Sequence, residues 1–398
     1  MTGIAEFATR ERSRSIPISS LHEIHRLVGE RESDTIALHV GEPFLRMPES
    51  ASEAFVRAIR DGHTSYTDAP GLPALCRALA DRLADNGAPP AEHVFVTPGS
   101  CQALAAVLQS VAFDGGVALL PEIHWPIHLQ QVLLAGLRPR FFREADPAAA
   151  LDEAYSPDVC VVIVNSPANP SGVVLDGRTL ADIHDWAVRK RVWVVSDEAY
   201  EDFVYEGAAP RMAALDAGRP AAERVVFSVH TFSKGFSMTG CRLGYVAAPT
   251  AERAQLLRRV QEATLVSPST PVQYAGLAVL DDERHLAAHH AYVRATRDEV
   301  VRLAGPLVWR VPAGGWYALL DLSAHTADTD LFCRQLLDET GVALAPGWGF
   351  VPSGNPLGRR LARLTLCWER ATTLQGVQRL LDYLPLAAPD LSLAAPDL

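Results

Sequence analysis

The sequence has no long hydrophobic run, no basic cluster and no closely spaced cysteine pair, and each absence excludes a class of protein. No apolar run reaches the roughly 18 residues that a membrane-spanning helix needs. Because the chain lacks a basic run and carries a formal net charge of -11, nucleic acid is not an expected partner. Residues 1–14 mix charged and apolar side chains and do not read as a signal peptide.

The six cysteines are scattered, and none belongs to a Cys-x-x-Cys motif. This usage is typical of reduced thiols in a cytoplasmic protein and argues against disulfides or a zinc site. His124 and His128 also lack the spacing of metal ligands, so we expect them to be structural or solvated. No bound metal is expected.

What the chain does have is enough apolar sequence for a large core. Its 398 residues are 48% hydrophobic and 21% charged, a composition that suits a soluble globular protein. This length is sufficient for two domains, or for one large domain and a smaller one.

Short apolar runs alternate with helical segments between residues 94 and 229. This βαβ pattern predicts an α/β fold with a mostly parallel central sheet and helices on both faces. The run 159–164 is continuously apolar, as expected for a strand that is covered on both sides. The expected strands are 94–97, 117–120, 159–164, 192–195 and 225–229, and the expected helices are 48–60, 74–86, 100–111, 127–135 and 179–189.

The C-terminal third predicts a second, smaller α+β domain. A long helical region is expected at 268–303, strands at 309–311, 316–321, 342–345 and 362–366, and helices at 328–340 and 372–384. We expect a large domain over 48–285 and a small domain formed by 1–47 and 286–385. Residues 386–398 repeat Ala-Ala-Pro-Asp-Leu and are expected to be disordered. The amphipathic stretch 21–28 fits either an arm that packs on another subunit or a terminal helix.

Lys234 follows the expected strand 225–229 and is flanked by small and hydroxyl residues. Partial burial at a strand end would lower the pKa of its amine and make it a nucleophile for a carbonyl cofactor. Arg242 and the hydroxyl groups nearby would then be free to hold an anion. The alternative is a solvated loop lysine, and this segment alone does not decide between the two.

Other residues of complementary chemistry also follow the carboxyl ends of expected strands, where open parallel sheets bind ligands. The turn into the helix at 100–111 offers free backbone N–H groups to an anion, and Trp125 offers a flat stacking surface. Each residue alone also fits ordinary packing or an ordinary strand–turn–helix. Together the set can hold a charged aromatic cofactor: Gly99, Trp125, Asn169, Asp197, Tyr200 and Lys234.

Taken in order, these segments resemble the class I/II aminotransferases, which are pyridoxal-phosphate enzymes of the aspartate-aminotransferase (fold type I) superfamily. The resemblance covers residues 36–384, and the order of its segments is far more specific than any one of them. The matching segments are 41–43 (Gly-Glu-Pro), 66–71, 99–101 (Gly-Ser-Cys), 165–172, 197–200 (Asp-Glu-Ala-Tyr), 233–245, 346–350 and Arg363.

The resemblance implies pyridoxal 5'-phosphate as the cofactor. It implies that Lys234 forms a Schiff base with it and carries a proton to and from the substrate α-carbon. Asp197 would face the pyridine nitrogen and keep it protonated, so that the ring is an electron sink. The other implied contacts are Tyr200 and Asn169 with the ring 3-oxygen, Trp125 with the ring face, and Gly99, Ser100, Cys101, Thr231, Ser233 and Arg242 with the phosphate.

The resemblance also implies a homodimer with shared active sites, because Tyr66 would reach the phosphate bound by a neighbouring subunit. Arg363 would bind the substrate α-carboxylate as a bidentate fork, with help from Gly41 and Asn169. The implied substrates are an L-amino acid and a 2-oxo acid, used in cytoplasmic amino-acid metabolism or biosynthesis.

A few positions depart from the usual pattern. Cys101 stands where a small or basic residue is more common. Trp316 and Trp348 are bulky near the expected substrate mouth, where they either shape the site or simply pack. No second arginine is clearly placed for a distal carboxylate, which disfavours an aspartate-type substrate.

Transamination is the expected activity. The alternative is a lyase or cyclase of specialised metabolism that performs β-elimination, C–S cleavage or decarboxylation-linked chemistry, because such relatives keep the same cofactor residues. A transcription regulator with an aminotransferase-like domain is disfavoured, since few residues precede the motifs and the net charge is negative.

Overall fold

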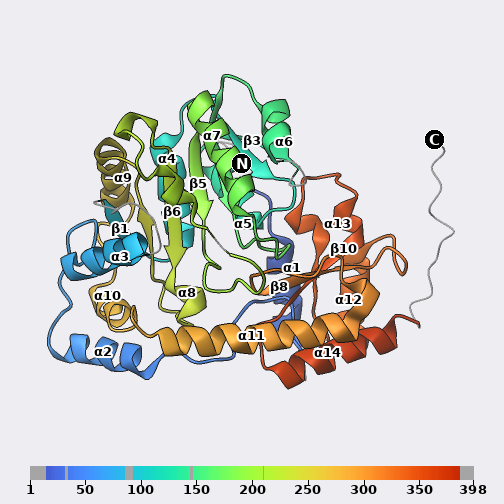
Figure 1. The fold of residues 1–398 in the computed structure, drawn as a ribbon. Helices are drawn as coiled ribbons and strands as arrows, with labels where there is room; N and C mark the ends of the chain where they lie inside the picture. Colours follow the sequence, from blue (N-terminus) through green and yellow to red (C-terminus); the bar gives the residue numbers. More distant parts are fainter. Residues whose placement is uncertain (1–14, 32–34, 86–92, 144–146, 209, 386–398) are drawn as a thin grey trace, which may run out of the picture.

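The computed structural model describes residues 15–31, 35–85, 93–143, 147–208 and 210–385. Within them the chain forms a seven-stranded sheet and a three-stranded sheet, both flanked by helices (Figure 1). The tail 386–398, for which disorder is expected, lies outside the described residues. None of the helices in these ranges combines the length and the apolar character that crossing a membrane requires.

The large sheet has the strand order β1-β7-β6-β5-β4-β2-β3. Strand β7 runs antiparallel to both of its neighbours, and the remaining pairs are parallel, which confirms the expected mostly parallel sheet. The strands are β1 (Val94–Thr97), β2 (Val117–Pro121), β3 (Arg138–Phe142), β4 (Val159–Asn165), β5 (Trp193–Asp197), β6 (Val226–Thr231) and β7 (Gly244–Ala247).

Helices cover both faces of this sheet, which explains why its central strands are continuously apolar. In β4, Val161 and Ile163 join one hydrophobic core, whereas Val162 and Val164 join another, as the alternation of side chains along a strand requires. The first core contains residues of α4 (Ser100–Val111), α5 (Pro126–Leu134) and α9 (Ala251–Thr264), and the second contains residues of α6 (Pro147–Ala154) and α7 (Gly177–Lys190).

A third core lies at the β1–β7 end of the sheet. It joins residues of α2 (Glu49–Arg60), α3 (Pro73–Asp85), α8 (Phe232–Gly235) and α10 (Thr270–Leu277). Because α8 belongs to this core, the short helix that carries Lys234 is packed from behind.

The small sheet has the antiparallel order β8-β10-β9. Figure 1 shows it on the opposite side of the molecule from α9, with the long α11 running beneath both sheets, and α11 contacts α8 as well as α14. The remaining elements are α1 (Ser20–Gly29), α11 (Glu283–Ala304), β8 (Tyr317–Asp321), α12 (Thr329–Thr340), β9 (Ala345–Pro346), α13 (Leu357–Arg360), β10 (Leu361–Thr365) and α14 (Arg370–Tyr383).

Two strands of the large sheet are not expected from the sequence. Strand β3 alternates arginines with apolar residues and is half exposed at the sheet edge, so it lacks the continuous apolar run of a central strand. Strand β7 is short and begins with glycine, a residue depleted in strands.

Three expectations for the C-terminal third are wrong in detail. The region 268–303 divides into α10 and α11, because the side chain of Asp282 accepts from the N–H of His285 and starts a new helix. Residues 309–311 form a bend in which only Trp309 N–H donates to a strand, at Leu319 O, and Pro312 then has no N–H to offer. The strand expected at 342–345 shrinks to β9.

Candidate active site

Eight of the residues singled out from the sequence line one cavity of about 220 Å³. It lies between the carboxyl ends of β4 and β5 and the strands β8 and β10. The eight are Gly41, Ser100, Trp125, Asn169, Asp197, Tyr200, Lys234 and Arg363. The cavity is completed by Leu21, His39, Val40, Asn165, Ala199 and Tyr317, which the sequence did not suggest.

The register of the large sheet brings the central residues together. Asn165, the last residue of β4, pairs with Asp197, the last residue of β5. The Asn165 side chain donates to Asp197 O at 2.9 Å and accepts from Asn169 N–H at 2.8 Å. Asn165 therefore fastens the loop after β4 and fixes the position of Asn169.

Lys234 sits on α8, whose first turn is capped by the hydroxyl of Thr231, which accepts from Ser233 N–H at 3.1 Å. Its Nζ lies 4.6 Å from the ring centroid of Trp316 and 5.6 Å from that of Tyr200. Among the described residues, no hydrogen bond or ion pair reaches this nitrogen. The amine thus rests on aromatic faces and is open to the cavity, and the solvated-loop alternative does not describe it.

Asp197 is only 3% exposed, and no lysine or arginine of the described chain pairs with it. One carboxylate oxygen, Oδ2, lies 2.8 Å from Nε2 of His128, and Oδ1 accepts from Ala199 N–H at 3.2 Å. His128 is fully buried on α5, so of its two expected roles, structural or solvated, the structural one applies, and it holds Asp197. A sequence signal existed, because His128 lies one helical turn after Trp125.

Arg363 is a buried cation at the opposite wall. Its Nη1 donates to Asn169 Oδ1 at 2.9 Å and its Nη2 donates to His39 O at 2.6 Å. No carboxylate of the described chain pairs with it, and burial lowers its pKa from the usual arginine value. A buried guanidinium without a counter-ion is a binding site for an anion.

A second group of expected residues gathers at the start of α4. Gly99 is the residue before the helix and has φ 82°, and Arg242 lies so close that a Cβ at position 99 would be 2.6 Å from its Nη2. Arg242 Nη1 also donates to Ser233 Oγ at 3.4 Å, and Thr231 Oγ1 donates to that oxygen at 3.0 Å. Free helix N–H groups, a guanidinium and hydroxyls together suit a phosphate.

Three other expected residues need separate comment. The Cys101 thiol accepts from Gln131 Nε2 at 3.3 Å, and burial raises its pKa, so it remains a neutral thiol. Tyr200 is buried between Trp316 and Tyr317, and burial raises the pKa of its hydroxyl. Tyr66 is 84% exposed and does not line the cavity of its own chain.

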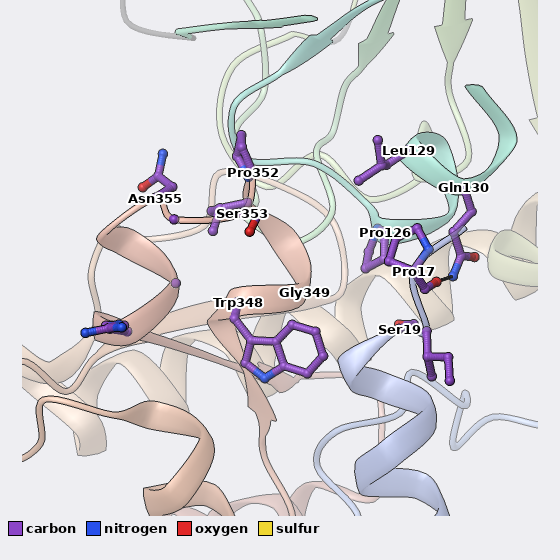
Figure 2. A pocket seen from close by; sticks show the side chains of 15 residues that line it. Pro17, Ser19, Pro126, Leu129, Gln130, Trp348, Gly349, Pro352, Ser353 and Asn355 are labelled. Atoms are coloured by element: carbon purple, nitrogen blue, oxygen red, sulfur yellow. Dashed lines mark hydrogen bonds between the residues drawn. The ribbon is translucent and has the colours of Figure 1, made fainter. Parts of the chain in front are cut away.

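A larger cavity of about 380 Å³ lies beside the N-terminal ends of α1 and α5 (Figure 2). Trp348 borders this cavity and not the smaller one, and its Nε1 donates to Asp330 Oδ1 at 3.2 Å. Figure 2 shows Trp348 on one side and Pro17 and Pro126 on the other. Its described lining combines prolines, glycines, aliphatic side chains and neutral polar groups with one arginine, Arg359, and it has no lysine or carboxylate. The amine and the carboxylate able to perform acid–base chemistry are in the smaller cavity.

Potential metal-binding atoms lie within 4.8 Å of one another on Glu198, Glu201 and His230. Those atoms already have partners, however. His230 Nδ1 lies 3.1 Å from Glu201 Oε1, and His230 Nε2 lies 2.6 Å from Ser228 Oγ. Glu201 also pairs with Arg211. These contacts account for the cluster as a polar network with a buried ion pair, and it gives no support for a metal site.

Comparisons with known proteins agree with this geometry. The chain matches the family model "Aminotransferase class I and II" over residues 33–380. It is 32% identical to the aspartate/prephenate aminotransferase of Thermus thermophilus, covering 81% of this chain and 85% of that protein. It is 30% identical to the aspartate aminotransferase of Geobacillus stearothermophilus, covering 88% of this chain and 92% of that protein.

Among solved structures, the aspartate aminotransferase of Thermus thermophilus with maleate superposes with a TM-score of 0.87 at 27% identity, covering 95% of this chain and all of that one. The fold is thus shared over nearly the whole matched length. The chain therefore belongs to the class I and II aminotransferase family and is a pyridoxal-phosphate-dependent aminotransferase.

Proposed function

We propose that the smaller cavity is the active site and that Lys234, Asp197 and Tyr200 are its catalytic residues. The observation that carries this proposal is the charge pattern of the cavity. It holds the amine of Lys234, the buried carboxylate of Asp197 and the buried guanidinium of Arg363. In the described chain, neither cation pairs with a carboxylate, and no lysine or arginine pairs with Asp197. Charges are left unpaired inside a protein only where something else neutralises them.

The residues present fit pyridoxal phosphate. An aldehyde needs an amine, which Lys234 supplies, and a protonated ring nitrogen needs a buried carboxylate, which Asp197 supplies. Trp125 and Asn169 line the same cavity and would contact the ring. The phosphate would be held at the start of α4 by Ser100 and the neighbouring Gly99, Thr231, Ser233 and Arg242. When bound, pyridoxal phosphate supplies an electron sink for negative charge at the substrate α-carbon.

The protein side chains then orient the substrate and move its proton. Arg363 would bind the α-carboxylate, with Gly41 and Asn169 beside it. The amine Nζ of Lys234 would take the proton from the α-carbon and return it at another position. Tyr200 would donate its hydroxyl proton as a hydrogen bond, because burial keeps that hydroxyl protonated.

We propose that the substrates include amino acids without a second carboxylate. In the described part of the cavity wall, Arg363 is the one guanidinium, and Leu21, Val40 and Trp125 are apolar or aromatic. Two of the relatives described above are named for aspartate, so aspartate is the comparison that the substrate test must include.

We further propose that the enzyme is a homodimer in the cytoplasm that serves amino-acid metabolism or biosynthesis. The exposed Tyr66 supports the dimer, because an 84% exposed tyrosine is free to reach a second copy. A reducing compartment is supported by the six cysteines, all of which have free thiols.

The deciding experiment is a half-reaction. Purified enzyme is mixed with single amino acids without an oxo-acid acceptor, and the cofactor absorbance, the oxo acid and the ammonia are measured. One oxo acid per site and no ammonia are expected, with apolar and aromatic amino acids faster than aspartate. Continuous ammonia release with an unchanged cofactor band would instead establish elimination.

The chain offers a matched control for the lysine, because it contains two lysines, Lys190 and Lys234. Lys190 pairs with Asp152 at 3.1 Å on α7, away from the cavity. Lys234→Ala should lose the cofactor absorbance band and nearly all turnover, whereas Lys190→Ala should keep both. Borohydride reduction followed by peptide mapping should place the cofactor on the 234 peptide, and a label on the 190 peptide would refute the assignment.

A further inference from the structure

Tyr317 lines the active-site cavity but has no part in the reaction as proposed above. It is the first residue of β8, and Arg363 lies on the adjacent strand β10. Since Arg363 is directly opposite Leu319 in the register, Tyr317 is its diagonal neighbour on the same face of the small sheet. The register therefore places the two side chains within reach of each other.

The contact between them is close. The Cζ atom of Arg363 lies 3.9 Å from the centroid of the Tyr317 ring and 4.7 Å from that of Phe350. Arg363 is 2% exposed and Tyr317 is 4% exposed, so this cation–π contact is desolvated. Cation–π contacts are strongest when they are desolvated.

The hydrogen bonds of Arg363 show what this stacking achieves. A guanidinium has five N–H donors in one plane. One donor on Nη1 goes to Asn169 Oδ1 and one on Nη2 goes to His39 O, while Nε is buried without a partner. One N–H on each terminal nitrogen remains, which is the pair that a carboxylate takes as a bidentate fork.

Gly41 has a structural reason to be glycine at this point. A Cβ at position 41 would lie 2.2 Å from the hydroxyl oxygen of Tyr317 and 2.9 Å from its Cζ. The same loop supplies His39 O to the guanidinium. The loop around Gly41 therefore contacts both members of the stacked pair, and it can approach Tyr317 only because residue 41 has no side chain.

We propose that Tyr317 is a positioning residue that, with Gly41 behind it, holds the Arg363 guanidinium in the orientation required to bind the substrate carboxylate. This inference rests on the proposed role of Arg363. It adds that the affinity of the site for carboxylates depends on the Tyr317 ring and on the space at Gly41, although neither supplies a charge.

The test measures binding and turnover separately. In Tyr317→Leu, the dissociation constant of the amino acid that reacts fastest in the half-reaction, followed by the cofactor absorbance, should rise about tenfold. Tyr317→Phe keeps the ring, so its dissociation constant should stay within about threefold of the parent enzyme. It loses the hydroxyl that hydrogen-bonds to Tyr200, so its turnover is measured separately and a change in turnover alone does not count against the proposal. The same comparison with the amine that lacks the carboxylate should show no effect of Tyr317→Leu, because no anion then reaches Arg363.

Gly41 gives a second, independent variant. Gly41→Ala should weaken carboxylate binding by displacing Tyr317. The double variant Gly41→Ala with Tyr317→Phe should recover part of the loss, because it removes the atom of the shortest contact and leaves the 2.9 Å approach to Cζ. Partial recovery would show that the two positions are coupled through their contact.

Tyr292 provides the matched control. Its ring carries Arg370 at 5.3 Å from the centroid, it is half-buried, and it lies outside the cavity. Tyr292→Leu removes a tyrosine–arginine contact outside the cavity, together with the hydrogen bonds of the hydroxyl with Trp368 O and Arg370 N–H, and should leave carboxylate binding unchanged.

Arg363→Lys separates the two levels of the argument. If it binds carboxylates normally, the proposed role of Arg363 fails. A second outcome is that Arg363→Lys loses carboxylate binding, whereas Tyr317→Leu binds carboxylates like the parent enzyme and has a thermal melt that shows it to be folded. In that case only the role of Tyr317 is overturned. Should Tyr317→Leu not fold, the Gly41→Ala pair decides: loss with partial recovery supports the proposal, and normal binding or no recovery overturns it.

Discussion

Single residues in the cavity are distinguished by the partners they lack. Three charged residues come from three different elements: Lys234, Asp197 and Arg363. In the described chain, no carboxylate pairs with Lys234 or Arg363, and no lysine or arginine pairs with Asp197. Asn169 accepts from Arg363, and its N–H donates to Asn165, whose side chain donates to Asp197 O. An arrangement of this kind costs stability in the empty protein and favours tight binding of ligands with the complementary charges.

The role proposed for Tyr66 requires a second copy of the chain, because Tyr66 does not line the cavity of its own chain. If it contacts the phosphate bound by the partner, Tyr66→Ala should weaken cofactor binding about tenfold, as expected for loss of a hydrogen bond to a charged group. Mixing Tyr66→Ala with Lys234→Ala should then give hybrid dimers in which one site has both defects and the other has none. Cofactor titration of the mixture should reveal a new class of tight sites.

The control for this experiment is the mixture of each variant with itself, which contains no intact site. Molar mass from light scattering establishes whether the enzyme is a dimer at all. Hybrids that bind no more tightly than Tyr66→Ala alone would show that Tyr66 serves its own subunit or no subunit.

At the scale of elements, the carboxyl ends of the strands and the start of α4 create the site. Asp197 and Thr231 could be predicted as site residues because they directly end buried strands, and the turn at Gly99 because it joins a strand to a helix. These positions lie at the same edge because a parallel sheet collects the carboxyl ends of its strands there.

Gly99 allows the element-scale prediction. It has φ 82° and touches Arg242, so Gly99→Ala should strain the turn and displace the guanidinium, weakening cofactor binding about tenfold or more. Gly115 has φ 83° with no atom within 4 Å of an added Cβ. Gly115→Ala therefore also places a side chain at positive φ, but without the collision.

Both variants should lose about 1 kcal/mol of stability from the left-handed backbone, measured by chemical denaturation without cofactor. Only Gly99→Ala should lose cofactor affinity, measured by fluorescence titration. Equal affinities in the two variants would mean that the start of α4 does not bind the phosphate.

For the whole molecule, the sequence predicted the large sheet and its covering helices better than the wall of the cavity that contains His39 and Tyr317. The large sheet was predictable because its central strands are buried on both faces and read as continuous apolar runs. His39 and Tyr317 were not, since they reach the cavity from elements that are distant in sequence and have no motif of their own. The contact of His128 with Asp197 was not predicted either, because its spacing from Trp125 indicates where it lies but not which carboxylate it supports.

Acid should destabilise the whole protein through its buried histidines. Burial lowers the pKa of His39 to about 3 and the pKa values of His124 and His289 to about 4. In the unfolded chain these groups titrate near 6.5, so the folded state binds fewer protons between pH 6.5 and 4. Their contribution to stability is complete above pH 6.5 and is lost as the pH falls through that window.

Asp202 acts in the opposite sense. Burial, followed by the nearby charge of Glu201, raises the pKa of Asp202 to about 6, so its contribution is present below its unfolded value of 3.8 and is lost as the pH rises through 6. To measure the contribution of a buried histidine to the pH dependence of stability, a single histidine must be replaced. His124 is suitable because it is 2% exposed, lies outside the cavity and makes a defined contact, 3.2 Å from Nδ1 to Glu122 O.

Between pH 7.5 and pH 5, each buried histidine should cost the folded state up to about 2 kcal/mol. His124→Asn keeps an N–H donor for Glu122 O but cannot titrate, so the free energy of unfolding should fall by about 1–2 kcal/mol less over this range than in the parent. Denaturant titrations of the holoenzyme at the two pH values measure the difference. His22→Asn, at an exposed position on α1, is the matched control and should follow the parent. If His124→Asn also follows the parent, burial of His124 is not a source of the acid sensitivity.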